Sequence, residues 1–142
     1  LKTVNTYVSL ASTVLASIAG ISLLVSALMI IVTMYMSVSE RTKEIGILRA
    51  LGERKKDIRR LFTSESVFIG LFSAILALLI VAVVTVIINH ALYGLIKYNI
   101  VQITVGNVIF AIVIAIVISF IAALLPARRA ANLNPIDALA AD

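Results

Sequence analysis

The chain has 142 residues, of which 62% are hydrophobic and 13% charged, and its net charge is +5 at pH 7. A soluble domain is roughly half apolar and a quarter charged, so lipid must solvate much of this chain. It contains no cysteine, which excludes disulfides, thiolate metal sites and thiol nucleophiles. Because it begins with Leu1 and shows no basic leader before its first apolar run, we expect it to be the C-terminal part of a longer protein.

Three segments are long and apolar enough to cross a bilayer, which takes about 20 residues. None shows the alternation of a barrel strand, so an all-α integral membrane fold is predicted. The first segment exceeds one membrane thickness and is expected to tilt or to continue beyond the lipid. We predict membrane helices over about 8–38, 64–90 and 104–126, separated by a charged loop over 39–63 and followed by a tail over 127–142.

Each predicted helix carries small residues at four-residue spacing, a pattern that lets helix backbones approach closely in lipid. Such residues are common in membrane helices, so packing among the three helices explains the pattern more simply than a dimer seam. No ionisable residue lies deep in a span, which argues against an ion or proton path. The three rows are Ser12, Ala16 and Gly20; Ser66, Gly70 and Ala74; and Ala111, Ala115 and Ser119.

Charge is concentrated in the stretch from Glu40 to Arg60, which contains eight of the 12 basic and four of the seven acidic residues. The tail adds two more basic residues on the same side of the spans, against only Lys2 and Lys97 on the other. Basic loops stay in the cytoplasm. We therefore predict a cytoplasmic loop and C-terminus and an extracytoplasmic N-terminus. His90, at the outer end of the second helix, is interpreted as an interfacial polar cap rather than a ligand.

Within the charged loop, residues 42–51 have the pattern of an amphipathic helix. One arc of about half the helical wheel holds Ile45, Ile47, Leu48 and Leu51. Gly52 supplies a helix stop because glycine takes a left-handed conformation without steric penalty. An apolar face outside the bilayer must rest on lipid or on a protein partner, and the pattern leaves both open. Interleaved acidic residues and the lack of stacking aromatics argue against nucleic acid.

The tail is expected to be folded. Pro126, Arg128 and Arg129 should form an anchor at the membrane interface: Pro126 should end or kink the third helix, and the two arginines should hold it at the headgroups. A short helix over 136–141 is predicted to follow, with an N-terminus favoured by Asn134 at the N-cap, Pro135 at the first position and Asp137 in the first turn.

Residues that could carry chemistry are sparse. The sequence has one histidine, no glycine-rich phosphate loop and no pair of carboxylates near a membrane pocket. We therefore expect a non-catalytic protein with no metal or cofactor of its own.

Two stretches are distinctive: SVSERTKEIGILRALGERKKDIRRLF, over 37–62, and LPARRAANLNPIDAL, over 125–139. The first resembles the signature of the FtsX-like permease family, the membrane subunits of MacB-type ABC transporters, in which a long helix ends in S-V-x-E-R-T-x-E-I-G-I-x-R-A-L-G. The second resembles that family's terminal motif, P-A-x-R-A-A-x-L-x-P-x-x-A-L. The chain departs from the pattern at Glu53, where the family usually has a small residue, and it stops at Asp142, where many members continue.

The resemblance implies a layout of four helices, with a large extracytoplasmic domain after the first. This chain would supply the last three, and the first helix and outer domain would lie upstream. The amphipathic stretch would be a coupling helix that docks in a groove of a separate cytoplasmic ATPase, which binds the ATP. The docking residues would be Arg41, Lys43, Glu44, Ile45, Ile47, Leu48, Arg49, Leu51 and Gly52.

The resemblance also implies a second permease copy, as a homodimer or heterodimer in the cell membrane. Three functions stay open. The chain could belong to a permease that exports or extracts a peptide, drug or lipoprotein by mechanical transmission. It could instead belong to a signalling subunit that activates an extracytoplasmic cell-wall hydrolase. The third alternative is a three-helix membrane adaptor with no ATPase.

Overall fold

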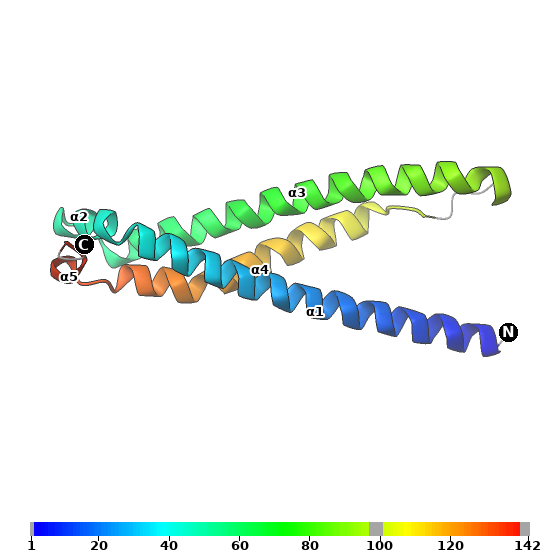
Figure 1. Ribbon diagram of the computed structural model, residues 1–142, viewed down its shortest axis with the longest axis horizontal. Helices are drawn as coiled ribbons and strands as arrows, with labels where there is room; N and C mark the ends of the chain where they lie inside the picture. The colour runs from blue at the N-terminus through cyan, green and yellow to red at the C-terminus, as the bar shows by residue number, and fades with distance from the viewer. Residues whose placement is uncertain (1, 97–100, 140–142) are drawn as a thin grey trace.

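The computed structural model describes residues 2–96 and 101–139, and these fold into α-helices with no β-strand among them (Figure 1). The helices are α1 (Lys2–Glu40), α2 (Thr42–Ala50), α3 (Lys55–Ile96), α4 (Val105–Ala131) and α5 (Pro135–Leu139). By length and composition, α1, α3 and α4 can each cross a membrane. The predicted all-α fold with three membrane-spanning helices is confirmed.

The three long helices meet at one end of the molecule, and α1 diverges from α3 and α4 toward the other (Figure 1). α3 and α4 pack side by side along most of α4, and α1 contacts α4 much more than α3. The short helices α2 and α5 contact each other at the end where the bundle closes. The charged part of the chain is therefore also the most tightly packed part.

The long helices extend beyond the predicted apolar spans. α1 has 39 residues, about 58 Å at 1.5 Å per residue, against a hydrocarbon core about 30 Å thick. Such a helix must tilt or continue outside the lipid, as expected. α3 begins at Lys55, so its basic residues that precede the predicted membrane span at residue 64 are helical and continuous with that span. Its added turns are stabilised because Ile58 and Phe62 are buried against other helices.

Small residues hold α3 and α4 together. Ser66, Gly70 and Ala74 of α3 are buried, as is Ser119 of α4. The α3 row is thus buried, and from the α4 row Ser119 and the Ala115 carbonyl lie against Gly70, in agreement with the packing interpretation, whereas Ala111 is exposed. The third row, on α1, is exposed, and a Cβ added at Gly20 would meet nothing within 4 Å.

The far ends of α3 and α4 are joined through one amide side chain. Asn89 Nδ2 donates a hydrogen bond to the Val101 carbonyl (2.9 Å), and the Val101 N–H donates to Asn89 Oδ1 (3.1 Å). Asn89 thus fixes the start of the segment that leads into α4, while its neighbour His90 is exposed. Lys97, which entered the topology prediction, lies outside the described residues.

The third helix was predicted to end or kink at Pro126; it does not end there, because α4 continues through Pro126 to Ala131. Proline lacks an N–H and therefore removes one helical hydrogen bond. The helix persists because Ala127, Ala130 and Ala131, beyond the proline, are buried in the packed end of the bundle. Packing of this alanine face outweighs the lost hydrogen bond.

Candidate functional site

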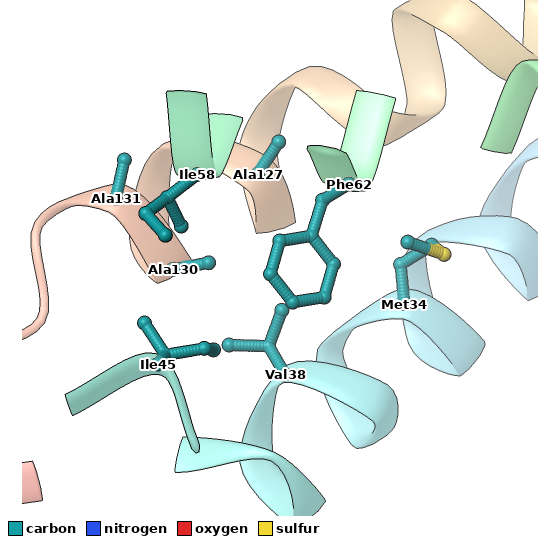
Figure 2. Close-up of a cluster of buried hydrophobic side chains, with 8 residues drawn as sticks. All are labelled: Met34, Val38, Ile45, Ile58, Phe62, Ala127, Ala130 and Ala131. Carbon is teal, nitrogen blue, oxygen red and sulfur yellow. The ribbon is translucent and has the colours of Figure 1, made fainter. Parts of the chain in front are cut away.

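A cluster of buried apolar side chains joins four helices at the closed end of the bundle (Figure 2). We call it the junction cluster; its members are Met34, Val38, Ile45, Ile58, Phe62, Ala127, Ala130 and Ala131. Phe62 lies at its centre, and Ile45 of α2 points toward Val38 and Ala130 (Figure 2). The cluster fixes α2 against the membrane helices, because moving α2 would expose Ile45 to water.

The turn from α1 into α2 is tied to α3. The Arg41 N–H donates to the Ser37 carbonyl (3.1 Å), and the Ile45 N–H donates to the Arg41 carbonyl (3.0 Å). The Arg41 side chain forms an ion pair with Glu65 of α3 (3.6 Å), with the two side chains 50% and 33% exposed. At this exposure the pair contributes less than about 1 kcal/mol. Its importance is geometric: Arg41, expected to face an ATPase, is paired within its own chain.

The apolar arc predicted for α2 is divided between two environments. Ile45 is 2% exposed and belongs to the junction cluster, so it is not available to a partner. The other three members are exposed, and Leu51 most of all at 80%. We call these three residues, Ile47, Leu48 and Leu51, the α2 surface. Lys43 and Glu44 of the same helix are also exposed.

Gly52 ends α2 through a Schellman motif, with a φ of +102°. The Glu53 N–H donates to the Leu48 carbonyl (3.0 Å) and the Gly52 N–H to the Arg49 carbonyl (3.2 Å), which satisfies carbonyls at the helix end. Arg49 Nη1 donates to the Glu53 carbonyl (3.0 Å). Arg49, another expected docking residue, therefore closes the turn. The left-handed conformation expected at Gly52 is present.

The tail helix α5 packs against α2. It begins at Pro135, where the Ile136 N–H donates to Asn134 Oδ1 (3.3 Å) and the Ala138 N–H donates to the Asn134 carbonyl (2.9 Å). Asn134 therefore has the hydrogen bond of an N-cap. Asp137 lies within α5, and the last residues of the predicted helix, 140 and 141, lie outside the described residues.

The three expected membrane anchors have different surroundings. Pro126 is fully buried between helices. Arg128 and Arg129 are exposed in the last turn of α4. The Arg129 guanidinium lies over the ring of Tyr35 in α1, 5.3 Å from its centroid, in the arrangement of a cation–π contact.

Two contact partners described above, Glu65 of Arg41 and Tyr35 of Arg129, were not identified from sequence. Glu65 is the first acidic residue beyond the charged stretch and lies at the edge of an apolar span. A lone carboxylate in that position usually has a cationic partner, and this signal could have indicated its pairing. Tyr35 gave no such signal. Within residues 2–96 and 101–139, no group of three or more His, Cys, Asp or Glu side chains could hold a metal ion.

Comparison with known proteins agrees with this arrangement. The family model of the FtsX-like permease C-terminal region matches residues 16–135. The chain is 38% identical to an uncharacterized ABC transporter permease of Methanocaldococcus jannaschii over 97% of its length. It is 34% identical to the macrolide export ATP-binding/permease protein MacB of Agrobacterium fabrum over 99% of its length, and 33% identical to the ABC transporter permease YtrF of Bacillus subtilis over 98%.

The chain spans only part of these relatives: 35% of the archaeal permease, 21% of MacB and 34% of YtrF. The family match nevertheless covers most of the chain, including the first sequence motif, the second motif as far as residue 135, and the whole junction cluster. The chain therefore belongs to the FtsX-like permease family.

Proposed function

We propose that this chain is the membrane-spanning part of an ABC transporter permease that receives ATP-driven movement from a separate cytoplasmic ATPase. The observation that carries the proposal is the α2 surface. Ile47, Leu48 and Leu51 are exposed on a short helix beyond the apolar spans, while Ile45 of the same helix fixes it to the bundle. A rigidly held helix with an exposed apolar face has the form that a protein groove accepts.

The contacts of α2 support mechanical transmission. A force on the α2 surface would pass through Ile45 into the junction cluster and through the Arg41–Glu65 pair into α3. α1 leads directly into α2 with only Arg41 between them, so the movement would also travel along its 39 residues. The far end of α1 would then deliver that movement to the outer side of the membrane.

Orientation and assembly form part of the same proposal. The charged end, with α2 and α5, would face the cytoplasm because it carries ten of the 12 basic residues. The exposed row of small residues on α1 would suit close contact with a second permease copy. MacB relatives are named for macrolide export; a comparable export or extraction role is proposed here, with the substrate bound outside the described helices.

Leu48 provides the direct test, because it belongs to the α2 surface and takes no part in the junction cluster. In Leu48→Glu, a charge would enter a desolvated contact at a cost on the order of 2 kcal/mol, or roughly thirtyfold in affinity. Co-purification with the ATPase, and stimulation of ATP hydrolysis by the permease, should fall accordingly. Leu48→Met is the matched control, since it keeps an apolar side chain of similar size.

Membrane insertion and helix content should be the same in both variants, because position 48 is 36% exposed and outside the core. If Leu48→Glu co-purifies with the ATPase as well as the parent protein does, the α2 surface is not the docking site.

A further inference from the structure

Four basic side chains surround an open hollow of about 180 Å³ where α3 begins and α4 ends. The residues that line it are Lys55, Lys56, Arg59, Arg128, Ala131 and Asn132. Its walls are joined by a hydrogen bond from Lys55 Nζ to Asn132 Oδ1 (3.2 Å). Among the residues that the structure describes, no acidic side chain lines the hollow. Two chain segments far apart in sequence thus bring four positive charges to one place.

These charges are unneutralised in the structure. The ion pair between Arg41 and Glu65 involves neither wall of the hollow, and in the described part of the chain none of the four cations is paired with a carboxylate. All four side chains are exposed. Ala131, by contrast, is 4% exposed and belongs to the junction cluster, so the wall behind the charges is part of the packed core.

The spacing of residues along α4 favours a position of the hollow at the depth of the lipid headgroups. Leu125 of α4 is 60% exposed on the apolar part of the helix, and Arg128 follows three residues later, about 5 Å farther along the axis. The headgroup layer is roughly 5–7 Å thick on each side of the hydrocarbon core. Arg128 therefore lies within it, and the long side chains from α3 can reach the same layer.

We propose that this hollow binds the phosphate of an anionic phospholipid. Basic pockets between membrane helices suit such headgroups, and Lys and Arg donors together satisfy several phosphate oxygens. The small volume fits one headgroup rather than a protein surface. A bound lipid would bridge the start of α3 and the end of α4, directly behind the junction cluster that holds α2.

The test compares two variants of the protein that lose the same number of charges. One carries Lys55→Gln, Arg59→Gln and Arg128→Gln in the hollow. The matched control carries Lys43→Gln, Arg54→Gln and Arg60→Gln, three exposed cations outside the hollow. Purified protein is exchanged into micelles with phosphatidylglycerol or phosphatidylcholine, and retained lipid is counted by native mass spectrometry.

The parent should retain phosphatidylglycerol in preference to phosphatidylcholine. The hollow variant should lose that retention roughly tenfold or more, while the control stays within about twofold of the parent. If both variants lose phosphatidylglycerol equally, retention depends only on the general attraction between a basic protein and an anionic lipid, and the proposal is overturned. A charge-conserving variant, Arg59→Lys, should retain the lipid, and circular dichroism should show the same helix content in all variants.

Two further outcomes would assign the hollow to another occupant. If inorganic phosphate displaces phosphatidylglycerol and binds equally well without it, the site takes a soluble phosphate and the lipid proposal is wrong. If the hollow variant keeps its phosphatidylglycerol but loses the ATPase on co-purification, the four cations serve a protein contact instead. Neither result depends on Leu48, so this test is separate from that of the α2 surface.

Discussion

Gly70 of α3 and Ser119 of α4 are packed so closely that no side chain fits between them. A Cβ added to Gly70 would overlap Ser119 Oγ, and it would lie 2.7 Å from Ser119 Cβ and 3.1 Å from the Ala115 carbonyl oxygen. The Ser119 hydroxyl is itself held by a hydrogen bond to that carbonyl (2.7 Å). In lipid, helices are held by close packing rather than by exclusion of water, so this contact determines how near α3 and α4 can lie.

Replacement of Gly70 by alanine should therefore loosen the α3–α4 pair. The methyl group must displace Ser119 or push the helix backbones apart, and overpacking of this kind costs about 1–3 kcal/mol. The expected result is a lower midpoint of unfolding when the protein in mild detergent is titrated with dodecyl sulfate. Helix content before the transition should be unchanged.

Gly20→Ala is the matched control, because nothing lies within 4 Å of a Cβ at that position, and its midpoint should equal that of the parent. The double variant Gly70→Ala with Ser119→Gly should recover stability, since the removed side chain makes room for the new one. If Gly70→Ala alone is as stable as Gly20→Ala, the helices are not in the close contact described.

Two phenylalanines of α3 should respond in opposite ways to truncation. Phe62 is 1% exposed at the centre of the junction cluster, whereas Phe68 is 70% exposed on the lipid-facing surface. Phe62→Ala should lower stability by about 3–5 kcal/mol, because it leaves a cavity among four helices. Phe68→Ala removes the same atoms from a surface that lipid can refill, and it should change the unfolding midpoint little. If the two variants lose similar stability, the junction cluster does not hold the closed end of the bundle together.

Hydropathy and helical periodicity predicted the fold well because long apolar segments in lipid must satisfy their backbone groups within helices. The small-residue rows were also informative, since the α3 row and Ser119 of the α4 row are buried. Helix ends were harder to place. At Pro126, local chemistry indicated a stop or a kink, but the buried alanines beyond it continue the helix, and such tertiary contacts cannot be read from local sequence.

The residues of α2 also show that local sequence does not reveal tertiary contacts. A helical wheel gives the direction of a side chain but not what covers it. Ile45 and Leu51 share one arc, yet the first is 2% exposed and the second 80%. Arg41 and Arg49 were likewise expected to meet a partner, and the structure engages both within the chain. The end of α2 depends on a backbone conformation that glycine adopts readily, so Gly52 could be identified from sequence as the helix stop.

Topology can be tested with single cysteines, because the parent has none to interfere. Arg54→Cys lies between α2 and α3, and Gln102→Cys lies before α4; both positions are exposed. With the charged end in the cytoplasm, an impermeant thiol reagent added to intact cells should label position 102 and not position 54. Permeabilised cells should label both, which controls for reactivity. Labelling at position 54 alone in intact cells would reverse the proposed orientation.

The last prediction concerns Gly52, where backbone conformation can be tested without steric interference. Its φ of +102° disfavours any residue with a Cβ, by roughly 1–2 kcal/mol, while a Cβ there would meet nothing within 4 Å. Valine should perturb the turn most because its branched side chain restricts the backbone further. Alanine should be intermediate, and asparagine, which tolerates positive φ, the mildest.

Loss of the turn should affect coupling more than stability. Without the hydrogen bonds from Gly52 and Glu53, α2 would run on toward Lys55, and the α2 surface would point in a new direction. We expect Gly52→Val to be produced and inserted normally but to lose stimulation of the ATPase, with Gly52→Ala partly impaired and Gly52→Asn close to the parent. The measurement is ATP hydrolysis by the reconstituted complex, with membrane content as the control. Equal stimulation by all three variants would show that coupling does not depend on the end of α2 at Gly52.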